Sequence, residues 1–143
     1  SLIVEKLGYY DLVLVGSTEL DMKEQDFITK GQRKDICLLT MDKNSLYHKV
    51  FNDYLRTSDI SLNGEMELVS TEAIKRSVIG NIGVSYLPRF TVAYELEQGI
   101  IQELSTSIQN RKIGAVCSYH KNKWISPAMD LFVRLLREQK PTK

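Results

Sequence analysis

Two kinds of hydrophobic pattern alternate along this chain. Short, nearly continuous apolar runs predict strands buried on both faces, and the clearest are residues 12–15, 36–40 and 113–119. Between them, apolar residues recur at helical spacing in 46–55 and 90–96. Because strands alternate with helices, the pattern predicts an α/β fold with mainly parallel strand pairing.

Residues 64–89 are the stretch around which the chain is organised. Ser70 and Thr71 carry hydroxyls that can accept hydrogen bonds from free amides at a helix start, and Pro88 ends the following strand. The stretch therefore predicts a short β-α-β unit. Its parts are a strand, a capped helix, a turn that tolerates left-handed geometry and a second strand, at 66–69, 73–79, Gly80–Asn81 and 83–87.

Three motifs carry a resemblance to a known family. They read Ser-x-Glu-Ala-Ile-Lys at 70–75, Val-Ile-Gly-Asn-Ile-Gly-Val-Ser-Tyr-Leu-Pro-Arg at 78–89 and Val-Ala-Tyr-Glu-Leu-Glu-Gln-Gly-Ile-Ile at 92–101. Together they resemble the effector-binding domain of LysR-type transcriptional regulators. The resemblance implies a type II periplasmic-binding-protein-like α/β fold. In that fold this stretch belongs to the second of two lobes, and a small-molecule effector binds in the cleft between them.

The resemblance covers nearly all of the chain but only about the last two thirds of a family effector domain. It implies that residues 1–18 are a remnant of the first lobe with the first crossing strand, that 19–105 form a complete second lobe, and that 106–143 hold the return strand and a helix opening at Ser126. The first lobe is then partial. The family's DNA-binding winged helix-turn-helix is not covered at all.

Two further expectations depend on that incomplete first lobe and on the polar segment 17–35. Without the missing strands, Val13 or Val15 should face water, and association of chains should bury them. In the segment 17–35, Phe27 and Ile28 are possible anchors, and Asp26–Phe27 suits a one-turn helix that the family often has there. The return strand should pair with the first crossing strand.

Composition excludes several classes of function. Hydrophobic residues make up 43% and charged residues 26% of the 143 positions, which are globular values, and the formal charge is only +1. Neither a nucleic-acid surface nor a membrane span is indicated. The resemblance implies a cytoplasmic protein that contacts DNA only through the N-terminal domain absent here, and the composition agrees with our expectation of no membrane partner.

The candidate binding residues follow two predicted strands. They are Thr40, Asn44 and Ser45 after the strand 36–40, and Ser70 with Thr71 in the central stretch. In open α/β sheets, ligands bind beyond the carboxyl ends of strands, at helix N-termini. Ordinary helix capping is the alternative role for the same side chains, and the resemblance favours binding because these loops match the family's cleft-lining loops.

Charged residues near those loops suggest a ligand with a negative group. Arg89 is a candidate partner for a carboxylate or another anion, whereas Lys75 and Arg76 are expected to face solvent. The paired carboxylates Glu65 with Glu67 and Glu95 with Glu97 are expected at solvated edges.

The cysteines and histidines give no catalytic pattern. Cys37 and Cys117 lie in apolar runs typical of buried, reduced thiols. His48 and His120 lack ligands at metal-binding spacing and are expected at the surface or partly packed. We therefore expect no metal, no cofactor and no enzyme activity.

The sequence thus predicts a ligand-sensing domain that binds a small polar or anionic effector to modulate transcription, as a homo-oligomer. Two alternatives remain. One is a small α/β enzyme that uses Cys37 or Cys117, and the other is a solute-binding protein of the same architecture.

Overall fold

The computed structural model describes residues 2–108 and 112–120, with side chains described for 11–108. Contacts divide the chain into two compact units, Ser1–Asp11 with Lys112–Lys143 and Leu12–Arg111, and each is described by itself. The predicted lobe boundaries at 18/19 and 105/106 stay a prediction.

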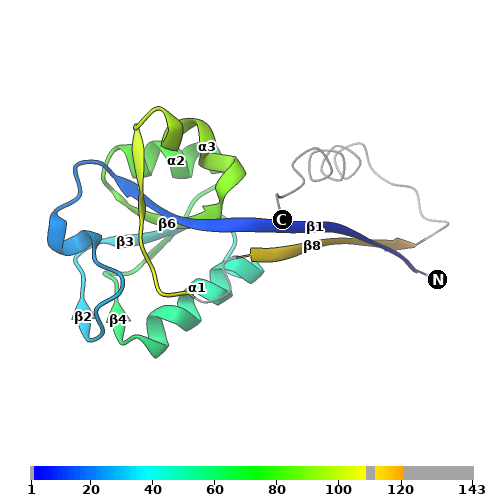
Figure 1. The fold of residues 1–143 in the computed structure, drawn as a ribbon, viewed down its shortest axis with the longest axis horizontal. Helices are drawn as coiled ribbons and strands as arrows, with labels where there is room; N and C mark the ends of the chain where they lie inside the picture. Colours follow the sequence, from blue (N-terminus) through cyan, green and yellow to red (C-terminus); the bar gives the residue numbers. More distant parts are fainter. Residues whose placement is uncertain (1, 109–111, 121–143) are drawn as a thin grey trace. The chain divides into compact units, whose positions relative to one another are not determined.

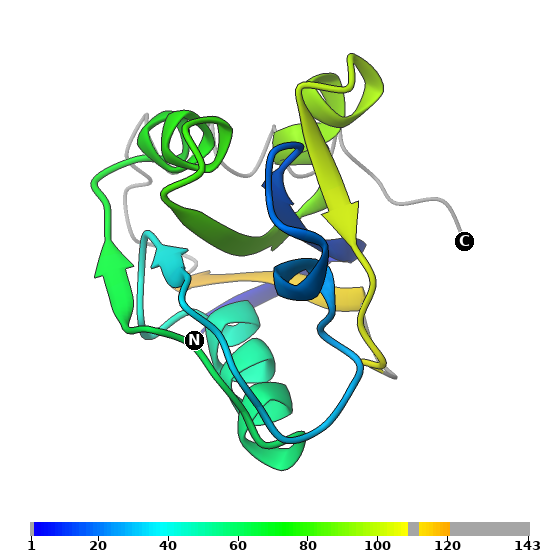
Figure 2. The ribbon, with the colours of Figure 1, turned by 90° about the vertical axis from the view of Figure 1, so that its left-hand side faces the viewer.

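The Leu12–Arg111 unit is built on a mixed sheet with the strand order β5-β3-β6-β1-β7 (Figures 1 and 2). Its strands are β5 (Glu65–Glu67), β3 (Cys37–Thr40), β6 (Gly83–Pro88), β1 (Leu2–Ser17) and β7 (Ile101–Leu104). A separate parallel pair joins β2 (Gln32–Arg33) to β4 (Ile60–Ser61).

The expectation of mainly parallel pairing is wrong. β3 runs parallel to β5 and β6, but β1 runs antiparallel to β6 and β7. A continuous apolar run reports that a strand is buried on both faces, and it carries no information about strand direction. The α/β class itself is correct.

Within the described residues, three α-helices cover the two faces of the sheet. α2 (Thr71–Ile79) and α3 (Arg89–Glu97) lie on one face, and α1 (Leu46–Thr57) lies on the other (Figure 1). α1 and α2 begin where the sequence indicated, at the N-caps Ser45 and Ser70. In the turn after α2 the left-handed residue is Asn81, with φ 60°, whereas Gly80 has φ −77°. None of the helices within the described residues is long and apolar enough to cross a membrane.

The core under α2 and α3 corrects the expectation of an exposed strip on β1. Val13 and Val15 are only 2% and 1% exposed. They pack with residues of the same unit because α2 and α3 already cover this face, so no missing segment is needed to bury them. The cluster also contains Leu39, Ile74, Val78, Leu87, Val92 and Ile101.

The opposite face is packed with aromatic rings. Phe51 of α1 stacks on Tyr86 of β6 with ring centroids 4.9 Å apart. The ring of Phe27 is tilted against that of Phe51, with the two centroids 6.2 Å apart. Phe27 is therefore the anchor that the sequence predicted, while Ile28 is 51% exposed and is not.

The short helix in the polar segment is η1 (Met22–Gln25), a 3-10 turn that ends before the predicted Asp26–Phe27. The displacement has a local cause. The Asp26 Oδ1 accepts hydrogen bonds from the amides of Ile28 at 2.8 Å and Thr29 at 3.0 Å, which holds Asp26 in a turn outside the helix. The predicted strand 66–69 is likewise shorter, and Val69 lies outside it, 95% exposed.

In the other unit, the first part of β1 pairs antiparallel with β8 (Lys112–His120), from Leu2↔His120 to Asp11↔Lys112. The return strand therefore pairs with β1, as predicted, but with residues 2–11; the predicted crossing run 12–15 pairs with β6 and β7 instead. The helix predicted from Ser126 and the side chains of Cys117 and His120 lie outside the described part of the chain.

Candidate functional site

Four strands of the Leu12–Arg111 unit end at one edge of the sheet. β3, β5 and β6 are parallel, and β7 shares their direction because β6 and β7 are both antiparallel to β1. The segments that leave this edge are 41–45, 68–70, Arg89 and 105–106. Such an edge is where open α/β sheets place their ligands.

The loop after β3 is held by its own side chains. The backbone N–H of Asn44 donates to the Asp42 Oδ1 at 2.9 Å, and the backbone N–H of Ser45 donates to the Asp42 carbonyl at 3.1 Å. The Ser45 Oγ then accepts from the His48 amide at 3.3 Å, so Ser45 acts as the N-cap of α1. Thr40, the last residue of β3, is 4% exposed.

The loop after β5 lies against the loop after β3. The Leu68 amide donates to the Thr40 carbonyl at 2.8 Å. Two residues later, the Ser70 Oγ accepts from the Ala73 amide at 3.1 Å and caps α2, whose first residue is Thr71. The structure therefore brings together the two predicted polar loops, those of Thr40–Ser45 and Ser70–Thr71.

Edge strand β5 carries two exposed carboxylates, as expected of a solvated edge, and both contact this region. The Glu67 Oε2 accepts from the Lys43 amide at 3.4 Å, and the Glu65 Oε2 lies 3.6 Å from the His48 Nε2. Both side chains leave β5 toward the start of α1, because alternate residues of a strand point to the same face.

His48 corrects the expectation of a surface or partly packed histidine. It is only 6% exposed, and its Nε2 lies 2.7 Å from the Asn52 Nδ2. The spacing of His48 and Asn52, one helical turn apart, could have indicated their contact, but no local signal linked His48 to β5.

The cations near the edge are held in ion pairs. The Arg89 Nη2 donates to the Glu103 Oε1 at 2.9 Å, and both side chains are 38% exposed. Lys75 was expected to face solvent but is only 15% exposed, with its Nζ 3.3 Å from the Glu72 Oε1 and 3.4 Å from the Glu95 Oε1.

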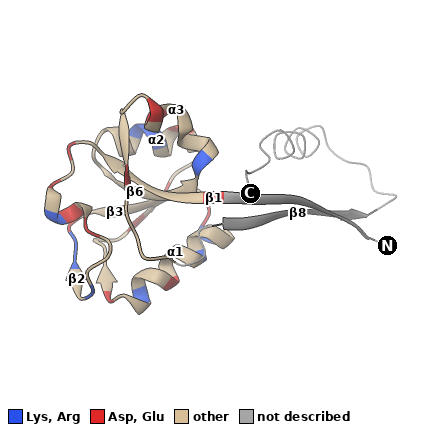
Figure 3. Ribbon diagram, viewed as in Figure 1, with Lys and Arg blue, Asp and Glu red and all other residues tan. Residues whose placement is uncertain are grey.

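Glu95 is likewise 15% exposed and not at a solvated edge. α3 packs beside α2, and this side-by-side arrangement turns Lys75 and Glu95 toward each other. Arg76 is exposed, as predicted. Figure 3 shows acidic and basic residues interspersed over the coloured elements.

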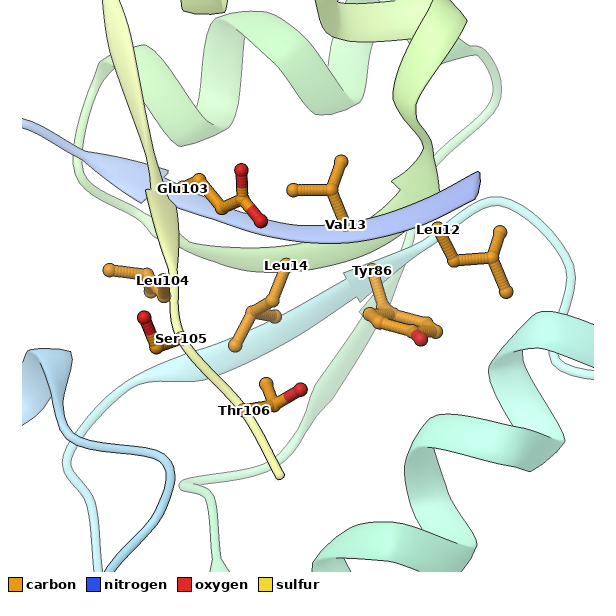
Figure 4. Close-up of a pocket in the computed structure, with 8 residues that line it drawn as sticks. All are labelled: Leu12, Val13, Leu14, Tyr86, Glu103, Leu104, Ser105 and Thr106. Atoms are coloured by element: carbon orange, nitrogen blue, oxygen red, sulfur yellow. The ribbon is translucent and has the colours of Figure 1, made fainter. Parts of the chain in front are cut away.

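A hollow of about 90 Å³ opens at the same edge, on the α1 side of the sheet. Figure 4 shows Leu14, Tyr86 and Thr106 on one side of β1, with Val13 on the other. The hollow is large enough to hold several water molecules. Sequence reasoning missed it, although Ser105 and Thr106 directly follow strand β7, as other candidates follow β3 and β5. Its lining residues are Leu12, Val13, Leu14, Tyr86, Glu103, Leu104, Ser105 and Thr106.

The described residues do not support a nucleophile or a metal centre. Burial raises the pKa of the Cys37 thiol, and the nearby Glu65 carboxylate raises it further, so the thiolate is disfavoured. Within the part of the chain whose side chains are described, no three His, Cys, Asp or Glu residues gather as metal ligands.

Comparison with known proteins agrees with this arrangement. The profile of the LysR substrate binding domain matches residues 1–141. The chain belongs to this LysR family. The HTH-type transcriptional regulator YfiE of Escherichia coli strain K12 is 39% identical over 133 residues, which are 93% of this chain and 45% of YfiE. The chain thus spans about half the length of the curated relatives it matches.

Solved LysR regulatory domains share the fold. The Synechocystis PCC6803 CcmR regulatory domain in complex with 2-PG has a TM-score of 0.62 at 18% identity, covering 96% of this chain and 66% of that one. The bromide ion-bound regulatory domain of HypT from Salmonella typhimurium has a TM-score of 0.62 at 19% identity, covering 96% and 64%. The type II periplasmic-binding-protein-like α/β fold predicted from the sequence is therefore confirmed.

Proposed function

We propose that this chain is the effector-sensing part of a LysR-type transcriptional regulator, and that a small polar effector binds at the carboxyl edge of the sheet in a cleft between two lobes. The observation that carries this proposal is the hydrogen bond from the Leu68 amide to the Thr40 carbonyl. It joins two loops that are rich in hydroxyl and amide groups at the edge where such folds bind ligands.

The residues proposed to contact the effector are the predicted ones: Thr40, Asn44, Ser45, Ser70 and Thr71, with Arg89 at the periphery. Arg89 can bind the effector only where the effector displaces the Glu103 carboxylate, whose Oε1 accepts from the Arg89 Nη2 at 2.9 Å. The Cys37 thiol, whose pKa is raised, gives no support to the alternative of a small enzyme.

The effector acts in this proposal by favouring one arrangement of the lobes. A ligand shifts such an equilibrium only by its difference in affinity for the two arrangements. The output is DNA binding by a winged helix-turn-helix outside this chain, which fits the HTH-type name of YfiE. We propose further that the protein is cytoplasmic, forms a homo-oligomer and has no enzyme activity.

Thermal-shift screening of the chain against a library of polar metabolites tests the proposal, followed by calorimetry on each hit. Thr71→Val removes a hydroxyl with little change of shape, and Ser45→Asn keeps a capping side chain. Both should weaken binding about tenfold, the loss expected for one hydrogen bond. Ser61→Ala, exposed on β4, is the matched control. Full affinity in both site variants would remove these loops from the site.

A further inference from the structure

We infer that the hollow of about 90 Å³ beside β1, β6 and β7 is a second binding site, for a small uncharged molecule with a hydroxyl or amide group. The inference goes beyond the proposed function, because none of the residues proposed to contact the effector is among those that line the hollow. A cavity with apolar walls and a few polar groups is the usual form of a small-molecule site.

The part of the sheet that lines the hollow divides its charged and uncharged side chains between two faces. Residues directly opposite each other on antiparallel strands point to the same face. Leu14 is paired with both Leu104 and Tyr86, so these three side chains share the α1 face. Glu103 is paired with Val15 and belongs to the other face, as Figure 4 shows.

The α1 face of the hollow therefore favours a neutral ligand. Among the lining residues that the structure describes, those on this face are uncharged. Moving an unpaired ion from water onto such a surface is costly, whereas a neutral molecule that keeps one hydrogen bond loses little.

The apolar side chains of the hollow are held in place by the core. Leu12, Leu14 and Leu104 are buried. The Tyr86 ring stacks on Phe51 of α1, with the two ring centroids 4.9 Å apart. Side chains fixed in this way need little rearrangement on binding, which limits the entropy lost.

The segment after β7 supplies hydroxyl groups to the hollow. The Thr106 Oγ1 accepts from the backbone N–H of Ile108 at 3.4 Å, and Thr106 forms a parallel bridge with Phe27. A hydroxyl has one donor and two acceptor positions, so the Thr106 O–H can still donate to a ligand. Ser105 beside it is exposed and carries a second hydroxyl.

The volume of the hollow sets the size of the ligand. An apolar cavity of about 150 Å³ binds benzene, so this hollow takes a molecule of about four non-hydrogen atoms. Short-chain alcohols and primary amides have this size. They offer an uncharged polar group to Thr106 and a methyl group to Leu14 and Leu104.

Three small probes test the inference. Acetamide and acetate have nearly the same shape and differ in charge, and propan-2-ol represents the alcohols. Each is titrated into the isotope-labelled chain at constant ionic strength, and methyl and amide NMR signals report binding. Acetamide and propan-2-ol should shift the signals of Leu14, Leu104 and Thr106 saturably, at concentrations on the order of millimolar, as expected for such small ligands. Acetate at the same concentrations should not.

Variants of Thr106 test the role of its hydroxyl. Thr106→Val removes the hydroxyl with little change of shape and should weaken acetamide binding about fivefold, the loss expected for one hydrogen bond. Thr106→Ser keeps the hydroxyl and should keep most of the affinity. Thr18→Val makes the same change at an exposed position directly after β1, at the opposite edge of the sheet, and should leave the affinity unchanged.

Three results would overturn the inference. They are the lack of a saturable shift at Leu14 and Leu104 with either neutral probe, an acetamide affinity that Thr106→Val leaves unchanged, and acetate binding as tight as that of acetamide. The signals of residues 40–45 and 68–72 are read separately in the same titrations. Failure at the hollow therefore leaves the proposed effector site standing.

Discussion

The Tyr54 hydroxyl donates to the Phe27 carbonyl at 2.5 Å, across 27 positions of sequence. The same oxygen accepts from the Ser107 amide at 2.9 Å. The Tyr54 side chain of α1 is therefore hydrogen-bonded both to the polar segment after β1 and to the segment that follows β7.

Tyr54→Phe should lower the free energy of unfolding by about 2 kcal/mol, because two partners at once lose a hydrogen bond. Urea unfolding followed by circular dichroism measures the change. Tyr94→Phe is the matched control, since Tyr94 is 64% exposed, and it should stay within about 0.5 kcal/mol of wild type. Equal stability of Tyr54→Phe and wild type would show that these bonds contribute nothing.

The Lys75–Glu95 pair should matter more than the Lys75–Glu72 pair. Both members of the former are 15% exposed, whereas Glu72 is 74% exposed and its attraction to Lys75 is screened by water. Glu95→Gln should cost about 2 kcal/mol and Glu72→Gln less than about 0.5 kcal/mol. Double-mutant cycles with Lys75→Met should give a larger coupling energy for Glu95; a larger value for Glu72 would contradict the burial argument.

Asp26 should make the fold sensitive to acid in a defined window. Its hydrogen bonds with the Thr29 side chain, the Thr29 amide and the Ile28 amide lower its pKa from 3.8 to about 2. Because the pKa is lower in the folded state, the stabilisation is fully present above pH 3.8 and is lost as pH falls toward about 2.

Urea unfolding between pH 2 and pH 5 measures this loss. Asp26→Asn keeps an acceptor but cannot titrate, so its stability should fall less steeply than that of wild type across this window. If the free energy of unfolding falls with pH equally steeply in the two proteins, Asp26 does not titrate as described.

Alanine should destabilise the protein far more at Gly83 than at Gly80. A Cβ on Gly83 would lie 2.3 Å from the Cys37 carbonyl oxygen on the neighbouring strand, a contact that only backbone movement relieves. Gly83→Ala should cost roughly 3 kcal/mol or more, or prevent folding.

At Gly80 the closest atom to such a Cβ is the Arg76 carbonyl oxygen, at 3.4 Å, and φ is −77°. Gly80→Ala should therefore stay within about 1 kcal/mol of wild type. Urea unfolding of the two variants side by side checks the pair, and similar stabilities would contradict the geometry.

The sequence predicted features that depend on a few neighbouring residues. The two helix starts were found because a side-chain oxygen before a helical period is itself the physical cause of a helix start, although Asp42 and Asn44 were candidate caps beside Ser45. Strand β6 was found because the run 83–87 is apolar between a glycine and a proline.

Features that depend on a distant element were not predictable in this way. Val13 or Val15 was expected to face water because the first lobe is incomplete, and nothing local shows that α2 and α3 cover both residues. Lys75 looks like any surface lysine until α3 places Glu95 beside it. The amide of Lys43 and the carboxylate of Glu67 are 24 positions apart and meet only through the pairing of β3 with β5.

Strand β1 pairs with β8 along its first part and with β6 after that. Asp11 is the last residue paired with β8, and Leu12 is the first paired with β6. Side chains of a strand change face at every residue, so the register of Leu12–Val15 against β6 decides which face Val13 and Val15 occupy. One residue inserted after Leu12 would turn both valines toward the α1 face unless a β-bulge absorbed it. The pairing with β8 already has such an irregularity between Lys6 and Gly8, so the Leu2–Asp11 part of β1 is the better place for an insertion.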